Sequence, residues 1–317
     1  MGGKNDTAPI QRHYMKILHI GDTAGVPTAL RDIDRKRGLK SDAIRTMPHP
    51  FNYNTDFYLQ IDGKNIHSIT NVIKLFSRCL KYDRIHSHKR PVQCGLDLLI
   101  LKYLFNKQIY IHYHGSEIRY KKQPKIHKLV ADKTYVSTPD LLRYVPSAEW
   151  LPNPVLLDEI PFEIREKYLK NRDKNTFTIL HTPTNELLKG TKYVNETIEK
   201  LQQDGYNINY ELVTGATHAE ALKAMAQCDV YIDQLLTGYH GVSSLECACM
   251  GVPAICYIDE KLYSEYRPPF IWAEPSSLYE TILYLYNLDY QKLLEIGTKE
   301  KIYYFEKHKA IINKIYR

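Results

Sequence analysis

The sequence predicts an α/β protein in which two Rossmann-like domains face each other across a cleft. Short apolar runs alternate with amphipathic segments in both halves of the chain, which is the pattern of parallel strands covered by helices. In each half, a buried strand opens into a glycine-containing loop that leads into a helix. Between the halves, residues 151–161 hold three prolines and no periodicity, so we expect a domain linker there.

Length and composition set the outer limits of this prediction. The chain has 317 residues, of which 44% are hydrophobic and 25% charged, and it fits two globular domains of about 150 residues. We expect a first domain at residues 1–155, a second at 156–290, and a C-terminal helix at 291–317 that packs back toward the first domain. The formal net charge of +7 favours anionic ligands or an anionic membrane surface, and it is too scattered to indicate nucleic acid.

Cysteine usage and the N-terminus indicate the compartment. Six cysteines without a C-x-x-C pair fit a reduced setting, where cysteine acts as a small hydrophobe. Residues 1–14 lack the apolar core of a secretory signal, and no run reaches the ~20 apolar residues that cross a bilayer. We therefore expect a cytoplasmic protein.

The first domain is expected to begin with the strand Lys16–Ile20, a loop through Gly21 and Gly25, and a helix to about Arg37. A dinucleotide site of the G-x-G-x-x-G type would need glycine where Thr23 stands, which argues against a nicotinamide or flavin site. The chain also has no G-x-x-x-x-G-K-[ST] segment, so a P-loop is excluded.

Helix and strand signals alternate through the rest of this domain. His114 follows an apolar strand and precedes Gly115, at the sheet edge where parallel folds hold functional groups. Position alone more often indicates a histidine that hydrogen-bonds a neighbouring turn. The expected helices are 69–80 and 91–105, and the expected strands are 82–86, 108–112, 133–136 and 149–151. A basic cluster follows, either a solvated face or one that rests on anionic lipid: Arg119, Lys121, Lys122, Lys125 and Lys128.

The second domain repeats the alternation, and its stretch Tyr231–Ile258 has the most compact pattern. Strand, glycine loop, helix (Val242–Gly251) and strand follow one another there, and free N–H groups at the helix start suit a diphosphate. Ser243 and Glu246 also match a capping box, which would satisfy those N–H groups locally. The other expected strands are 177–181 and 208–213, the helices are 193–203, 218–228 and those within 276–316, and 182–190 is a loop.

Several segments together resemble glycosyltransferase family 4, whose members have the GT-B fold. Their order and spacing over about 250 residues carry the resemblance, since no single motif is specific. The segments are KILHIGDTAG (16–25), YDRIHSH (82–88), IYIHYHGSEIR (109–119), ILHTPTNELLKGTKYV (179–194) and CDVYIDQLLTGYHGVSSLECACMGVPAICY (228–257).

The resemblance assigns roles to individual residues. It implies that His114 is catalytic and lies near the reacting sugar, that Lys189 meets the donor diphosphate, and that Glu246 binds the nucleotide ribose. The backbone of residues 241–244 would hold phosphate. The donor-binding residues are then Gly25, Lys189, Tyr239, Gly241, Val242, Ser243, Ser244 and Glu246.

Two departures from the family pattern concern the donor sugar and the phosphate. The first glutamate of the E-x7-E motif falls at Gly238 and is absent. The arginine that usually precedes the phosphate-loop lysine is also absent, because Pro183 and Thr184 stand in the corresponding positions. The residues that could substitute are His181, Asn185 and Tyr239.

The activity implied by the resemblance is retaining transfer of a sugar from a UDP- or GDP-linked donor to a saccharide or lipid-linked acceptor, with no other cofactor. No metal is expected, because the only Asp-x-Asp triplet, Asp32-Ile-Asp34, lies in a predicted helix. Attachment to the inner membrane face is expected from the basic cluster and the Tyr/Lys-rich C-terminus. Three alternatives stay open: an inactive GT-B partner subunit, a nucleotide-sugar 2-epimerase, and a binding module for anionic glycans or lipids.

Overall fold

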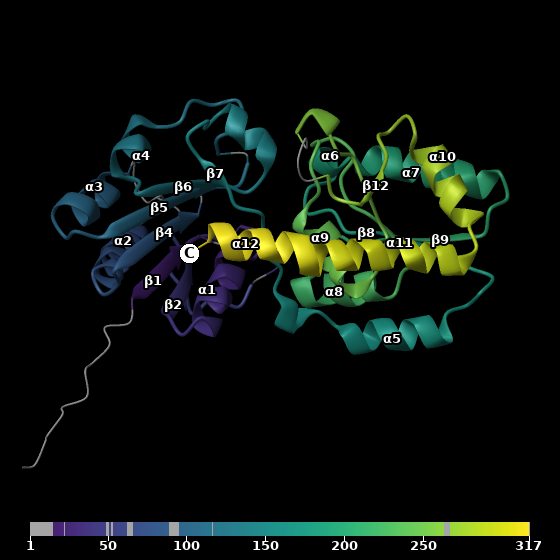
Figure 1. The fold of residues 1–317 in the computed structure, drawn as a ribbon, viewed down its shortest axis with the longest axis horizontal. Coiled ribbons are helices and arrows are strands. Elements are labelled where there is room, and N and C mark those ends of the chain that lie inside the picture. The colour runs from purple at the N-terminus through teal and green to yellow at the C-terminus, as the bar shows by residue number, and fades with distance from the viewer. Residues whose placement is uncertain are drawn as a thin grey trace, which may run out of the picture.

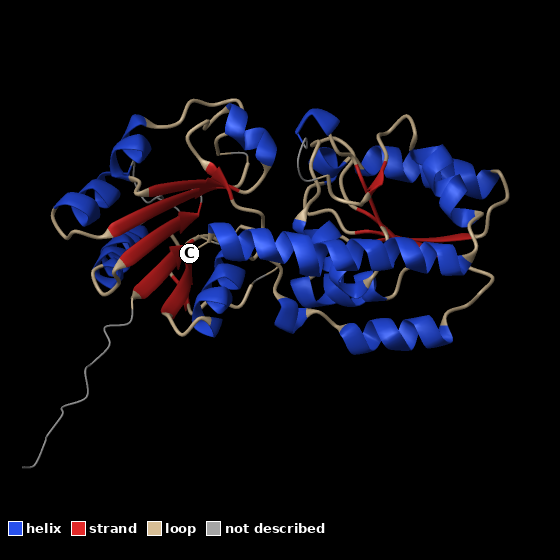
Figure 2. Ribbon diagram, viewed as in Figure 1, coloured by secondary structure: helices blue, strands red, loops and turns tan. Residues whose placement is uncertain are grey.

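The computed structural model describes residues 15–21, 23–48, 51, 53–61, 66–88, 95–115, 117–262 and 267–316. The N-terminal segment 1–14 and Cys94 lie outside the described residues. Two α/β units lie side by side, and a long C-terminal helical segment runs across both of them (Figure 1). Figure 2 shows a separate sheet in each unit with helices around it.

The sheet of the first unit has seven parallel strands in the order β3-β2-β1-β4-β5-β6-β7. Parallel neighbours need crossover connections, and helices supply most of them here. The strands are β1 (Lys16–Ile20), β2 (Lys40–Arg45), β3 (Phe57–Tyr58), β4 (Arg84–His88), β5 (Gln108–Tyr113), β6 (Lys133–Val136) and β7 (Glu149–Trp150). The helices are α1 (Val26–Lys36), α2 (Ile66–Cys79), α3 (Leu96–Tyr103) and α4 (Lys125–Val130), with a 3-10 turn at Pro139–Arg143.

The sheet of the second unit has five parallel strands in the order β12-β11-β10-β8-β9. The strands are β8 (Phe177–His181), β9 (Ile208–Leu212), β10 (Val230–Ile232), β11 (Ala254–Cys256) and β12 (Ile271–Trp272). The helices are α5 (Phe162–Asn171), α6 (Glu186–Lys189), α7 (Thr191–Gln203), α8 (His218–Ala226), α9 (Val242–Met250) and α10 (Leu278–Tyr286), with 3-10 turns at Leu157–Glu159 and Glu260–Leu262.

The C-terminal segment connects the two units. Helix α11 (Tyr290–Ile302) continues through a π-helical turn (Tyr303–His308) into α12 (Lys309–Ile315). At the linker, His308 Nε2 lies 2.8 Å from the carbonyl oxygen of Asn153. The segment ends in the first unit, where the buried Tyr316 hydroxyl donates to the carboxylate of Asp34 over 3.1 Å. Tyr303, Tyr304 and Tyr316 of this segment are buried, whereas its lysines are exposed.

The described residues include five elements that the sequence analysis does not name: β2, β3, β12, α4 and α5. Strand β2 (KSDAIR) holds four polar residues, and its Asp42 accepts from Arg35 and from the Tyr82 hydroxyl. Helix α5 buries Arg165, which donates to the carbonyl oxygen of Cys228 over 2.7 Å. Tertiary partners therefore make these polar segments regular. The expected loop 182–190 also contains one helical turn, α6.

Within the described residues, no helix combines the length and apolarity that a membrane crossing requires.

Candidate active site

A cavity of about 350 Å³ lies where the loops after the strands of both sheets meet. Open parallel sheets bind ligands at the carboxyl ends of their strands, so this cleft is the candidate site. The first unit contributes Thr23, Ala24, Phe51, Tyr53, His114, Arg119, Thr138 and Asn153. The second unit and α6 contribute Thr184, Asn185, Leu188, Lys189, Gln234, Thr237, Tyr239, His240, Gly241, Val242, Ser243 and Glu246.

Lys189 is held at this cleft by a buried carboxylate that the sequence analysis does not identify. Its ammonium forms an ion pair with Asp233, which follows β10 and is fully buried. Asp233 also accepts from the Gly241 N–H over 2.5 Å and from the Ser244 hydroxyl over 2.7 Å. Burial favours a raised pKa for Asp233, but the Lys189 charge and these hydrogen bonds outweigh it, and the pKa of Asp233 is lowered.

Gly241 is the N-cap of helix α9, and the capping-box interpretation of Ser243 and Glu246 is wrong. Among the described residues, no side chain caps this helix, so the N–H groups of its first turn remain available at the cleft. A Cβ on Gly241 would lie 2.6 Å from Asp233 Oδ2 and 3.0 Å from Lys189 Nζ. Only glycine allows so close an approach, and this contact sets where the helix starts. The Ser244 side chain lies behind the cleft wall, bonded to Asp233.

Glu246 lines the cleft, and its carboxylate is paired with a histidine. Its Oε1 lies 2.7 Å from His218 Nε2, and His218 Nδ1 lies 2.8 Å from Glu159 Oε2. Burial alone would lower the pKa of His218, but the two carboxylates raise it to about 9, so the ring is an imidazolium at neutral pH. The Tyr53 ring of the first unit packs over it, with ring centroids 4.9 Å apart. The sequence analysis missed this triad, because its members come from three separate segments.

His114 lies on the opposite wall, directly after β5, at the end of a chain of hydrogen bonds. Its Nδ1 is 2.5 Å from the Ser137 hydroxyl, and its Nε2 is 3.0 Å from His88 Nδ1. His88 Nε2 is 3.1 Å from His19 Nδ1, and His19 Nε2 is 2.9 Å from Asp34 Oδ2. If all three rings are neutral, every hydrogen bond in this series must donate toward Asp34, because a carboxylate only accepts. The protons then sit on Nε2 of each histidine, and Ser137 donates to His114.

Of the two remaining donor-site predictions, Tyr239 lines the cavity and Gly25 does not. Tyr239 lines it although the residue is 4% exposed, and its ring packs edge-on against Trp150. Gly25 is the N-cap of α1 with φ of 68°, and a Cβ there would lie 2.8 Å from the Tyr53 ring. Its neighbours Thr23 and Ala24 are the residues of this loop that line the cavity.

Arg119 was expected on the basic surface, and the structure corrects this. It lines the cleft, and its Nε donates to Asp140 over 2.8 Å. His181 is excluded as a substitute for the missing arginine, because it is fully buried and its ring contacts Ile232 O and Thr191 Oγ1. Arg119 therefore supplies a guanidinium to the cleft from the first unit, which no motif search within the second unit could find.

Gly238 lies beside the cleft in an adjoining cavity of about 350 Å³. Its φ is 73°, and a Cβ would lie 3.3 Å from the Asp259 Cβ. The position where the family pattern has its first glutamate thus has a backbone conformation that favours glycine.

Comparison with solved structures identifies the fold. HepE from Anabaena, in complex with UDP and glucose, has a TM-score of 0.66 at 13% identity, with 96% of this chain and 98% of that chain covered. Sucrose-phosphate synthase from Thermosynechococcus elongatus has a TM-score of 0.65 at 16% identity, with 95% of this chain and 97% of that chain covered. A protein from Listeria monocytogenes described as a UDP-N-acetylglucosamine 2-epimerase has a TM-score of 0.55 at 12% identity, with 91% of this chain and 90% of that chain covered.

These likenesses confirm the predicted fold class: two Rossmann-like domains facing across a cleft, as in the GT-B glycosyltransferases. Neither protein-family models nor curated proteins match the sequence.

Proposed function

We propose that the protein is a glycosyltransferase that moves a sugar from a nucleotide-diphosphate sugar to an acceptor. The observation that supports this proposal is that groups suited to a diphosphate and groups suited to a sugar line opposite sides of one cleft. Lys189 and the uncapped start of α9 line one side, and His114 and Arg119 line the other. The solved structure of HepE holds UDP and glucose, which favours UDP over GDP as the donor nucleotide.

The chemistry of sugar transfer fits this charge distribution. As the bond between sugar and diphosphate breaks, negative charge grows on the leaving phosphate. Lys189, Arg119 and the N–H groups of α9 stabilise this charge more in the transition state than in the ground state. We propose that the transferred sugar is a hexose and that transfer retains the anomeric configuration, as the resemblance to family 4 implies. His114 then orients the sugar or moves a proton at its hydroxyls.

Protein cations fill the electrostatic role that a divalent cation plays in other transferases, so we propose that transfer needs no metal at the diphosphate. The Asp-x-Asp triplet gives no cleft ligand, because Asp34 is buried in α1 and accepts from His19, Ser41 and Tyr316.

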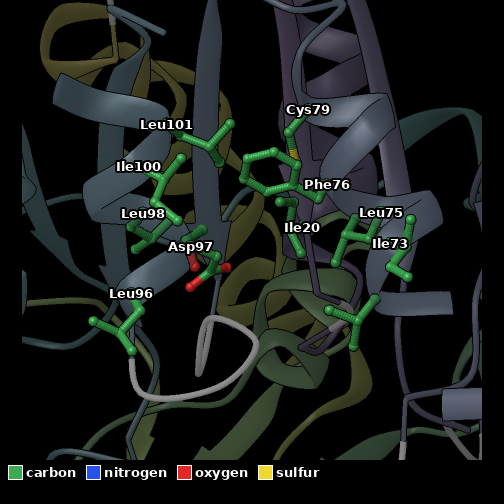
Figure 3. Close-up of a pocket in the computed structure, with 12 residues that line it drawn as sticks. Ile20, Ile73, Leu75, Phe76, Cys79, Leu96, Asp97, Leu98, Ile100 and Leu101 are labelled. Carbon is green, nitrogen blue, oxygen red and sulfur yellow. The ribbon is translucent and has the colours of Figure 1, made fainter. Parts of the chain in front are cut away.

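An apolar pocket in the first unit supports a lipid-linked acceptor. It has a volume of about 330 Å³ and lies between α2 and α3, which contribute most of its side chains (Figure 3). Its floor includes Ile20 and Ser87, at the carboxyl ends of β1 and β4. Because His114 lies at the same end of the sheet, a chain bound here would direct its head group toward the cleft. Burial raises the pKa of Asp97 in this pocket to about 6.

The surface beside this pocket supports attachment to a membrane. Helix α3 and the residues after it expose Leu96, Ile100, Tyr103 and Leu104. Helix α4 packs against α3, where the Tyr103 hydroxyl donates to the Leu129 carbonyl. Helix α4 also exposes the basic residues Lys125 and Lys128. An apolar edge bordered by lysines is the composition that binds anionic bilayers, at about 1 kcal/mol per basic residue. We propose peripheral attachment through this face.

Liposome sedimentation tests the membrane proposal. Binding to anionic vesicles should exceed binding to neutral ones and should weaken in high salt. Leu104→Glu should reduce it, while Tyr284→Glu, at another exposed position on α10, should not. Equal binding of both variants, or none by the native chain, contradicts the proposal.

Activity assays separate the candidate functions. Incubation with UDP- and GDP-sugars should produce slow donor hydrolysis, and transfer when saccharide or lipid-linked acceptors are added. The likeness to the Listeria 2-epimerase favours one alternative, which would invert the sugar at C2 without an acceptor. Binding of nucleotide without either reaction would indicate an inactive partner subunit and would refute the enzyme proposal.

A further inference from the structure

Behind His114, histidines on three adjacent strands form a buried cluster. His19 lies on β1, His86 and His88 on β4, and His112 on β5. The parallel register aligns them, because His19 pairs with His86 and His88 with His112. All four are at most 1% exposed. Residues two apart on a strand share a face, so the four rings gather on one side of the sheet.

His86 has an arrangement that the hydrogen-bond chain of the cleft does not explain. Neither of its ring nitrogens has a hydrogen-bond partner among the described residues, although the side chain is fully buried. An unsatisfied buried polar group destabilises the folded state, and the His86 imidazole has two of them. A hydrophobic side chain would fill the same space without this cost, so the ring indicates a ligand.

The rings of His19, His86 and His88 are arranged like the ligands of a metal ion. One nitrogen from each ring lies within 4.8 Å of the others. The ring centroids are 5.0 Å apart for His19 and His86, 4.1 Å for His86 and His88, and 5.4 Å for His19 and His88. The His19 Nδ1 to His88 Nε2 separation of 3.1 Å is close to the roughly 3.3 Å between two nitrogens bound tetrahedrally at about 2.0–2.1 Å.

We propose that His19, His86 and His88 form a site for a transition-metal ion of the Zn²⁺ class. Neutral imidazole nitrogens suit Zn²⁺, Co²⁺, Ni²⁺ and Cu²⁺, while Mg²⁺ and Ca²⁺ prefer oxygen ligands. The site lies inside the first unit, separate from the Lys189 wall where the donor diphosphate is proposed to bind. An ion at this site would not contact the diphosphate, where the transfer proposed above needs no metal.

The groups around these rings are suited to such an ion. The Nε2–H group of His19 donates to the Asp34 carboxylate. This gives a carboxylate–histidine–metal arrangement that fixes the ring and adds a compensating negative charge. Asp34 is in turn held by Ser41 and Tyr316. His19 Nδ1 needs no change, because it already presents a lone pair.

Metal binding reverses the remaining hydrogen bonds without releasing a proton. His88 binds through Nε2 after its proton moves to Nδ1, and it then donates to His114 Nε2. His114 in turn carries its proton on Nδ1 and donates to the Ser137 hydroxyl. The ion thereby determines the tautomer of the histidine at the cleft.

The test uses the full-length protein, stripped with a chelator, equilibrated with Co²⁺ or Zn²⁺ and desalted. We expect stoichiometric retained metal and the intense visible absorption of tetrahedral Co²⁺. Thermal unfolding should shift upward with added Zn²⁺ by mass action. His86→Phe should abolish all three signals yet remain folded without metal, because the substitution removes two unsatisfied polar atoms. His127→Gln, a buried histidine outside the cluster, should leave them unchanged.

Three results would overturn the proposal. Absence of retained metal in the native protein refutes the site directly, without any variant. Binding that persists in His86→Phe assigns the metal to other groups. Binding lost in His112→Phe but kept in His86→Phe assigns it to the neighbouring group His88, His112 and His114, whose nitrogens also lie within 4.8 Å of one another.

Discussion

The two walls of the cleft are built on the same strand–loop–helix pattern but differ in how they hold charge. In the second unit, Lys189 rests on the buried Asp233 beside an uncapped helix start. In the first unit, His114 ends a series of hydrogen-bonded rings, and burial followed by neighbouring histidines lowers the pKa of His88 well below its ordinary value. The wall of the second unit therefore presents a lysine held by a buried anion. The wall of the first unit presents, beside the guanidinium of Arg119, a histidine whose chain of hydrogen bonds allows two proton positions. Binding a diphosphate needs the first property, and chemistry at a sugar hydroxyl needs the second.

The largest expected effect comes from removing the buried anion of the charged wall. Asp233→Ala leaves the Lys189 ammonium without its partner and the Ser244 hydroxyl without its acceptor. Breaking a buried ion pair on one side costs about 3–5 kcal/mol, so the free energy of unfolding should fall by that amount. Urea denaturation measures it. The double variant Asp233→Ala/Lys189→Met should recover part of the loss, and no recovery would show that the pair is not the cause.

Removing the His114 ring should act on catalysis and leave nucleotide binding intact. His114→Ala is expected to reduce the transfer rate by ~10²-fold or more, while nucleotide affinity is retained. Single-turnover kinetics and nucleotide titration report the two quantities separately. Full transfer activity in this variant would end the assignment of His114 as the catalytic residue.

Removing the Lys189 charge in the second unit should act mainly on nucleotide binding. Lys189→Ala is expected to weaken binding of UDP or the equivalent nucleotide by about 1.5–3 kcal/mol, the range of a charge-assisted hydrogen bond. Isothermal titration calorimetry measures this. Lys192→Ala is the matched control, because Lys192 is an exposed lysine three residues away. Among the residues that the structure describes, its only ion-pair partner is Glu196, one helical turn further on. Equal affinity of the Lys189 variant and native protein would remove Lys189 from the site.

The imidazolium of His218 gives stability a pH dependence. Its pKa in the folded protein, about 9, lies above the ordinary value of 6.5. The stabilisation is therefore fully present below pH 6.5 and is lost as pH rises through about 9. The effect should be modest, since the Glu159 side chain is 38% exposed and solvent screens that pair. Thermal unfolding from pH 6 to 10 should show this decline, and His218→Gln should flatten it.

The smallest effect is expected beside the cleft, at Gly238. Gly238→Ala should destabilise the fold by about 1–2 kcal/mol, because a left-handed φ strains any residue with a Cβ. Gly238→Glu should add repulsion from Asp259 to the same strain. Gly205→Ala, also at positive φ but with open space around it, separates conformational strain from the contact with Asp259. Equal losses at both positions would show that the contact contributes nothing.

The sequence by itself determined the elements whose burial pattern is local. The apolar runs of β1, β6 and β8 mark strands at the bounds that the structure has, and their alternation with helices predicts parallel sheets. His114 could be singled out because a strand end followed by glycine is visible in the chain. The polar segments β2 and α5 could not be predicted in this way, since their secondary structure depends on partners distant in sequence. Arg165 of α5, for example, donates to the carbonyl oxygen of Cys228.

Only the tertiary structure decided which polar groups meet. The motif at Ser243 and Glu246 fits a cap or a ligand site equally well as a sequence, and the choice depends on how closely Gly241 packs on Asp233. The buried histidines were likewise unrecognisable as a set, because strand register brings His19 beside His86 across 67 residues and Tyr316 reaches Asp34 across 282. Periodicity along a chain encodes which side chains are buried, whereas their partners are set by the order in which strands pair.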